Sequence, residues 1–211
     1  MIPTREEWIA ALEQRHGASL QKKLSEATVA VCGLGGLGSN IANALARAGV
    51  GRLILIDFDQ VDITNLHRQQ FKPNQIGQKK TDALAENLLE AAPYIQIQKV
   101  PERITQNNVL SILKDADVIC EAFDNPEAKA MLTNCVQESL PEIYLVAASG
   151  MAGLGSPNTI HTRKITKRFY LCGDEISDAS DSIGLVSSRV MLCAAHQAHT
   201  VLRILAGEFE V

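Results

Sequence analysis

A glycine-rich loop followed by polar side chains is the strongest chemical signal in this chain. Gly33, Gly35 and Gly38 form a G-x-G-x-x-G pattern between a predicted strand and a predicted helix, where the backbone can approach a phosphate closely. The amides at the start of such a helix carry about half a positive charge and bind phosphate oxygens without any side chain. Asp57 follows the next predicted strand, at the spacing of an acid that binds ribose hydroxyls. The sequence therefore predicts a nucleotide site.

Further polar residues distinguish a triphosphate ligand from the pyrophosphate of a dinucleotide. Arginine binds phosphate oxygens in pairs, lysine supplies a point charge, and a carboxylate can hold Mg²⁺. The candidates of these types, with neighbouring polar groups, are Asp59, Asn65, Arg68, Gln69, Lys80, Asp124 and Asn125. Singly, Arg68 and Lys80 could be solvated surface residues, and Asp124 could cap the helix that begins at Pro126. Their joint occurrence favours ATP and Mg²⁺.

Strands that alternate with helices must position these residues. Hydrophobic runs and helix-end signals predict strands over residues 28–32, 52–56, 95–100, 118–122 and 144–148, and helices over 41–48, 80–92, 109–113, 126–138 and 187–205. This pattern predicts an α/β fold with a Rossmann-like, doubly wound, mostly parallel sheet and helices on both faces. Two short runs, 158–162 and 168–172, are expected to add antiparallel edge strands. Ligands of such sheets bind beyond the carboxyl ends of the strands, where the polar cluster falls.

Length and composition favour one compact domain. The 211 residues are 46% hydrophobic, and we expect a single domain over 1–211, with a helical arm over 1–27 and a mobile loop over 173–184. A net charge of −4 argues against a nucleic-acid partner. No run approaches the roughly 18 apolar residues of a membrane span, and the charged N-terminus is unlike a secretory signal. We therefore expect a cytoplasmic protein with no membrane partner.

The cysteines and the basic residues carry weaker signals. The five cysteines are an odd number without any C-x-x-C pair, so neither a disulfide framework nor a zinc ribbon is predicted. Cys172 alone lies beside a polar loop and is the one candidate for a reactive thiol. A basic patch, Arg163, Lys164, Lys167 and Arg168, is interpreted as a solvated edge rather than as a docking site.

Four motifs together carry a family resemblance. They are GLGGLGSN, LILIDFDQVDITNLHRQ, IGQKK and a later strand that ends in DN. In this order, over residues 15–207, they resemble the ThiF/MoeB/HesA family, relatives of the ubiquitin-activating enzymes that adenylate the C-terminal glycine of a small carrier protein. The resemblance implies Gly36 at the phosphates, Asp57 on the ribose, Asn65 and Arg68 on the phosphates, Gln69 in support, Lys80 on the transferring phosphate and Asp124 on Mg²⁺. It also implies a catalytic arginine from a neighbouring subunit, at the position of Arg15.

The resemblance implies a homodimeric adenylyltransferase that activates a ubiquitin-like sulfur carrier ending in Gly-Gly, of the ThiS type, in thiamine thiazole biosynthesis. No zinc is expected, because the two C-x-x-C pairs of many relatives are missing. Three alternatives stay open: MoeB-like activation of a molybdopterin-synthase carrier, an NAD-dependent dehydrogenase, and an inactive nucleotide-bound partner subunit.

Overall fold

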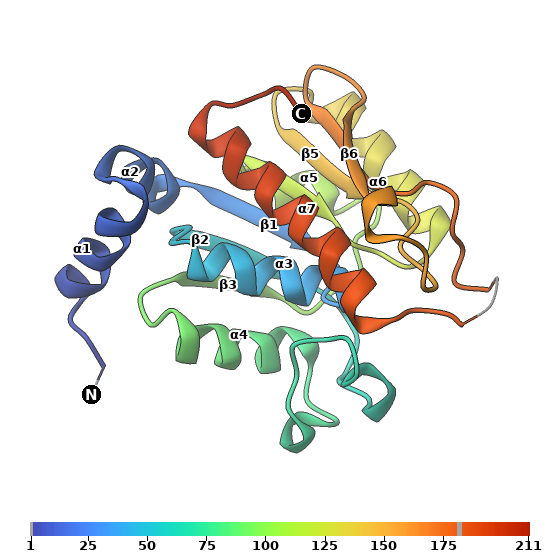
Figure 1. Ribbon diagram of the computed structural model, residues 1–211, viewed down its shortest axis with the longest axis horizontal. Helices are drawn as coiled ribbons and strands as arrows, with labels where there is room; N and C mark the ends of the chain where they lie inside the picture. The colour runs from blue at the N-terminus through green and yellow to red at the C-terminus, as the bar shows by residue number, and fades with distance from the viewer. Residues whose placement is uncertain (1, 181–182) are drawn as a thin grey trace.

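The computed structural model describes residues 2–180 and 183–211. Figure 1 shows a twisted sheet with helices on both faces. The sheet has seven strands in the order β3-β2-β1-β4-β5-β7-β6. The strands are β1 (Thr28–Cys32), β2 (Arg52–Ile56), β3 (Gln96–Val100), β4 (Val118–Glu121), β5 (Tyr144–Ala148), β6 (His161–Lys164) and β7 (Phe169–Gly173). The helices are α1 (Arg5–His16), α2 (Ala18–Glu26), α3 (Gly36–Arg47), α4 (Lys80–Ala91), α5 (Val109–Leu113), α6 (Pro126–Ser139) and α7 (Ser187–Ala206), with 3₁₀ turns at Ile63–Asn65, Pro73–Gln75 and Pro157–Thr159.

Alternate residues of the central strands build two separate cores. Val29 and Val31 of β1 join one core with α3, α4 and α7, whereas Ala30 and Cys32 join the other with α5 and α6. Because successive side chains of a strand point to opposite faces, a fully apolar strand requires helices on both sides. This arrangement confirms the predicted doubly wound α/β class.

The edge of the sheet differs from the expectation in one respect. β6 pairs antiparallel with β7 as predicted, but β7 pairs parallel with β5, so only one antiparallel pair is present among the described strands. Residues 149–160 are long enough to carry the chain past the width of a strand, so that β7 returns between β5 and β6. Asn158 and Thr159, expected in a strand, lie in the 3₁₀ turn.

The ends of the helices follow local sequence signals, with one correction. Thr4 and Glu7 form a capping box at the start of α1, within the expected helical arm. α3 begins at Gly36 and not at Ile41, because the glycine loop itself forms the first turn of the helix, despite the poor helix propensity of glycine. Close packing against β1 and α7 overrides that propensity.

The expected mobile loop over 173–184 is described only in part, since Asp181 and Ser182 lie outside the described residues. Among the helices that the structure describes, none is both long enough and apolar enough to cross a membrane.

Candidate nucleotide site

The glycine loop connects β1 to α3 at the carboxyl edge of the sheet. Gly33 has a φ of +92°, and a Cβ there would lie 2.7 Å from the carbonyl oxygen of Ala122, while a Cβ on Gly38 would lie 1.8 Å from the carbonyl oxygen of Gly33. Both positions therefore require glycine. Gly35 is the N-cap of α3 and supplies no side-chain cap, so the first-turn amides at this helix start have no side-chain acceptor. Such uncapped amides suit a phosphate group.

Asp57 is buried at the end of β2 and holds two backbone amides. Its Oδ2 accepts from the amide of Leu34 in the glycine loop at 2.7 Å, and its Oδ1 accepts from the amide of Asp59 at 2.8 Å. A carboxylate oxygen has a second lone pair, which stays open to a ribose hydroxyl. The same bonds fix the position of Asp59, whose Oδ2 lies 3.0 Å from Nζ of Lys80. Lys80 is only 6% exposed at the first residue of α4, so a largely desolvated cation is linked to the glycine loop through Asp59 and Asp57.

Arg68 lies against the glycine loop. A Cβ built on Gly36 would be 3.5 Å from Cγ and Cδ of Arg68, which places the two in contact distance. Nη1 of Arg68 donates to the carbonyl oxygen of Thr64 at 3.0 Å, but its buried Nε has no hydrogen-bond partner among the described residues. An unpaired buried donor costs free energy unless a ligand accepts from it.

Two amide side chains complete this side of the site. Gln69 is 6% exposed, and its Oε1 is a buried acceptor without a partner in the described part of the chain. Asn65 uses its Oδ1 to accept from the amide of Asp62, so that its Nδ2 remains a donor. Unpaired donors suit phosphate oxygens, and an unpaired acceptor suits a hydroxyl or amino group of a nucleotide.

The turn after β4 brings the last predicted residues to the same edge. Asn125, not Asp124, caps α6, since its Oδ1 accepts from the amide of Ala128 at 2.9 Å. The alternative interpretation of Asp124 as a cap is therefore wrong, and its side chain is exposed at the carboxyl end of β4. Nδ2 of Asn125 stays available to a ligand.

Sequence reasoning missed Glu121, three residues before Asp124. Its carboxylate is 1% exposed, accepts from the amide of Phe123 at 2.7 Å and pairs with Lys129 of α6 at 2.8 Å. Burial raises the pKa of Glu121, and Lys129 partly offsets this shift. The signal was a charged residue inside an apolar strand, which is rarely buried unless paired.

Arg15 does not join the site of its own chain. It lies on α1, which is linked to the other end of α3 through His16, Gln21 and the carbonyl of Gly49. The twelve residues of α3 separate that end from the glycine loop by about 18 Å. Figure 1 shows α1 and α2 at one end of the sheet and the start of α3 at the other.

Two weaker expectations meet different outcomes. Cys172 is wrong as a reactive thiol, because it is 0% exposed in β7 and burial raises its pKa to about 11. The polar loop begins only after β7 has placed this side chain in the core.

In the basic patch, Arg163 pairs with Glu175, Lys164 with Glu210 and Arg168 with Glu142, which agrees with a solvated edge.

The residues present fit ATP, and they fit Mg²⁺ only together with the nucleotide. Within residues 2–180 and 183–211, no group of three or more His, Cys, Asp or Glu side chains could hold a metal ion alone. Mg²⁺ is commonly held by one or two carboxylates plus substrate phosphates. A cavity of about 370 Å³ between α3 and α4 shares Gln69 with this site but contains neither Asp57 nor Lys80 nor Asp124, so the chemistry points to the strand ends instead.

Comparison with known proteins gives relatives along nearly the whole chain. The Sulfur carrier protein ThiS adenylyltransferase of Bacillus subtilis is 32% identical over 203 residues, which cover 91% of this chain and 58% of that protein. The Adenylyltransferase and sulfurtransferase UBA4 of Lodderomyces elongisporus is 28% identical over 197 residues, covering 90% of this chain and 42% of that protein. The chain thus spans about half the length of these relatives.

A solved structure supports the fold. The crystal structure of E. coli tRNA N6-threonylcarbamoyladenosine dehydratase, TcdA, in complex with ATP superposes with a TM-score of 0.86 at 20% identity, covering 99% of this chain and 98% of that one. At this identity the likeness concerns the architecture. The model of the ThiF family matches residues 9–211, which include the glycine loop, Asp57, Arg68, Lys80 and Asp124. Because this match spans almost the entire sequence, the chain belongs to the ThiF family.

Proposed function

We propose that this chain uses ATP to adenylate the C-terminal carboxylate of a ubiquitin-like sulfur carrier protein. The observation that carries the proposal is that uncapped amides and Arg68 meet at one glycine loop, to which the buried Lys80 is linked through Asp59 and Asp57. A dinucleotide pyrophosphate needs few of these cations, whereas a triphosphate needs them all. The relative named as a ThiS adenylyltransferase supports the same activity.

The proposed reaction is an attack of one carboxylate oxygen of the carrier on the α-phosphorus of ATP. A new P–O bond forms, the bond to the β-phosphate oxygen breaks, and pyrophosphate leaves with the electron pair. Two anions must approach each other, so preorganised positive charge is the main requirement. Arg68 and the first-turn amides of α3 would receive the phosphates, Lys80 the transferring group, and Asp57 the ribose.

Mg²⁺ would neutralise phosphate charge and orient the leaving pyrophosphate when it is bound. Asp124 is the proposed carboxylate, because it is exposed at the end of β4 and is not the cap of α6. Its neighbour Glu121 would keep the turn in place through the amide of Phe123. We further propose that residues 1–211 act as one adenylation domain without zinc, in the cytoplasm.

We also propose a homodimer in which Arg15 reaches the site of the partner. The anchoring of α1 at the far end of α3 supports this arrangement, since Arg15 is separated from its own glycine loop. Arg15→Ala and Lys80→Ala should each lose activity, but mixed dimers contain one intact site. Equal mixing of the two chains should restore about a quarter of the wild-type rate by random pairing in a two-fold dimer. Failure of the mixture to recover any activity would contradict transfer of Arg15 between subunits.

The carrier class can be tested directly. The protein is incubated with ATP, Mg²⁺ and either a ThiS-type or a molybdopterin-synthase-type carrier ending in Gly-Gly, and the carrier mass is measured. We expect a carrier-AMP adduct with the ThiS type, in line with a role in thiamine thiazole synthesis. An adduct with the other carrier alone would reassign the pathway, whereas no adduct with either, together with stabilisation by NAD and not by ATP-Mg²⁺, would favour a dehydrogenase.

A further inference from the structure

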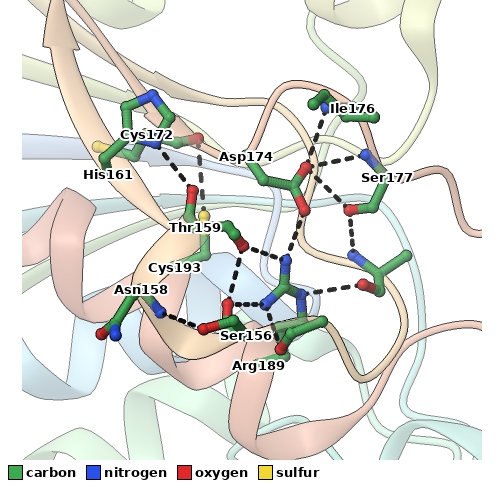
Figure 2. Close-up of polar contacts among 12 residues, drawn as sticks. Ser156, Asn158, Thr159, His161, Cys172, Asp174, Ile176, Ser177, Arg189 and Cys193 are labelled. Atoms are coloured by element: carbon green, nitrogen blue, oxygen red, sulfur yellow. Dashed lines mark hydrogen bonds and ion pairs between the residues drawn. The ribbon is translucent and has the colours of Figure 1, made fainter.

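Arg189, in the first turn of α7, is the most fully satisfied buried cation of the described chain. It is 6% exposed, and its five N–H groups donate to five acceptors at 2.5–3.0 Å, as Figure 2 shows. The acceptors are the carbonyl oxygens of Ala152, Gly155 and Ser156, the hydroxyl of Thr159 and the carboxylate of Asp174. The planar guanidinium has no donor left over.

Asp174 extends this network to the start of the loop after β7. Its Oδ2 accepts a hydrogen bond from Nη2 of Arg189. Its Oδ1 accepts from the amides of Ile176 and Ser177 and from the hydroxyl of Ser177. The hydroxyl oxygen of Ser177 in turn accepts from the amide of Ala152 at 3.0 Å. The bonds form a closed ring that ties the loop after β5 to the loop after β7 (Figure 2).

The two tied loops lie beside the proposed nucleotide site. β5 and β7 run parallel to β4, so their carboxyl ends reach the same edge of the sheet as the glycine loop. Val190, next to Arg189, lies 2.8 Å from the position of a Cβ on Gly36. Nε2 of His67, the neighbour of Arg68, lies 3.3 Å from the carbonyl oxygen of Leu185. The network is therefore fixed relative to the phosphate-binding residues.

The order of the strands indicates what these loops can contact. Asp57, at the end of β2, marks the side of the site proposed for the ribose, and the glycine loop follows β1 near the end of β4. In the strand order, β5 and β7 come next after β4, so they border the side of the site away from the ribose. Each tied loop also displays a large apolar side chain: Leu154 is 69% exposed and Ile176 is 88% exposed. Leu154 directly precedes Gly155 of the network, and the amide of Ile176 belongs to it, so the network fixes the backbone that carries these exposed apolar groups.

We propose that Arg189 is a positioning residue that holds residues 152–156 after β5 and residues 174–177 after β7 as a rigid wall along which the carrier's C-terminal peptide reaches the nucleotide. This inference rests on the proposed adenylation of a carrier. It assigns Arg189 no contact with ATP or with the reacting atoms. Its loss should weaken use of the carrier and leave use of ATP intact, because the peptide contacts the wall and the nucleotide does not.

The test compares Michaelis constants for the two substrates in carrier-AMP formation. Asp174→Asn and Arg189→Lys break the network, and Arg163→Met is the matched control, because it removes a cation from the exposed pair with the adjacent Glu175. We expect the first two to raise KM for the carrier by about tenfold or more, while KM for ATP stays within about twofold. Arg163→Met should change neither. Leu154→Ser, which leaves the network intact, should raise KM for the carrier alone and gives a readout even if Arg189→Lys fails to fold.

Two results would overturn the positioning role, provided that carrier-AMP still forms. One is an equal change in KM for the carrier and KM for ATP, and the other is no change in either KM for both Asp174→Asn and Leu154→Ser. Absence of carrier-AMP from the wild type with every carrier would instead defeat the proposed function itself. Amide hydrogen exchange provides an activity-independent check, since Asp174→Asn should speed exchange in residues 152–156 and 174–177. Unchanged exchange there would contradict the rigid wall.

Discussion

Two arginines at the carboxyl edge of the sheet are used in opposite ways. Arg189 donates all five of its N–H groups to protein acceptors. Arg68 donates to the carbonyl of Thr64, and its buried Nε has no partner within the described residues. The two side chains lie in neighbouring parts of the molecule, linked through Val190 and Gly36.

The pairing of its N–H donors indicates whether a buried arginine of this protein supports the fold or is available to a ligand. A buried arginine with every donor paired lowers the free energy of the folded chain, and a bound ligand would have to compete with those bonds. An arginine with a buried unpaired donor costs stability until a ligand accepts from it. The loss of Arg189 should therefore affect folding most, and the loss of Arg68 should affect chemistry most.

The largest effect on stability is expected for Arg189→Met. It leaves the Asp174 carboxylate buried without its cation, and removal of one partner of a buried pair typically costs about 3–5 kcal/mol. Urea unfolding followed by circular dichroism measures this loss. Arg68→Met is the control, and it should cost only about 1 kcal/mol, because it removes a single hydrogen bond to the backbone. Equal losses for both variants would remove the distinction between the two arginines.

On activity the order reverses, and Arg68→Ala is expected to have the largest effect. Loss of a preorganised cation at a developing charge typically costs about 2.7–4 kcal/mol at the transition state, so ATP–pyrophosphate exchange should fall at least about a hundredfold. Lys80→Ala and Asp124→Ala should behave alike, the latter with a changed dependence on Mg²⁺. Near-normal exchange in all three variants would end the assignment of the site.

Acid should weaken the Arg189 network by protonating Asp174. Burial acts to raise the pKa of Asp174, but hydrogen bonds from Ser177, Ile176 and Arg189 outweigh it and lower the pKa from 3.8 to about 2. A carboxyl with a lowered folded pKa stabilises the protein above its unfolded pKa, and this contribution is lost as the pH falls from about 4 through 2. The unfolding midpoint should drop in that range, and Asp174→Asn should abolish this part of the drop.

The smallest effect is expected for Arg163→Met. Its pair with Glu175 is a surface ion pair, with the Arg163 side chain 51% exposed, and such pairs contribute little because water screens them. The melting temperature should match that of the wild type. A clear loss of stability would mean that the network extends through Glu175 to the surface.

The positions of the proposed nucleotide-binding residues were predictable from the sequence for a simple reason. Asp57 follows β2 directly and Asp124 lies in the turn after β4, and parallel strands bring their carboxyl ends to one edge, so a one-dimensional pattern is enough to bring the two residues to that edge. The glycine loop is local in part: Gly38 is required by the nearby carbonyl of Gly33, and Gly33 by its positive φ, whereas the close approach of Ala122 to Gly33 comes from the end of a distant strand. The predicted helix at Pro126 and the capping box at Thr4 have the same local origin.

Only the tertiary structure decided the partners of Arg189, the burial of Cys172 and the insertion of β7 between β5 and β6. Three of the acceptors of Arg189 are backbone carbonyls, which every residue carries, so nothing in the sequence marks them. Cys172 belongs to a run next to a polar loop, and whether it faces the core depends on which strand pairs with β7. Local patterns determined the strands, helices and charged side chains of this chain, while long-range packing determined which of those charges stay open to a ligand.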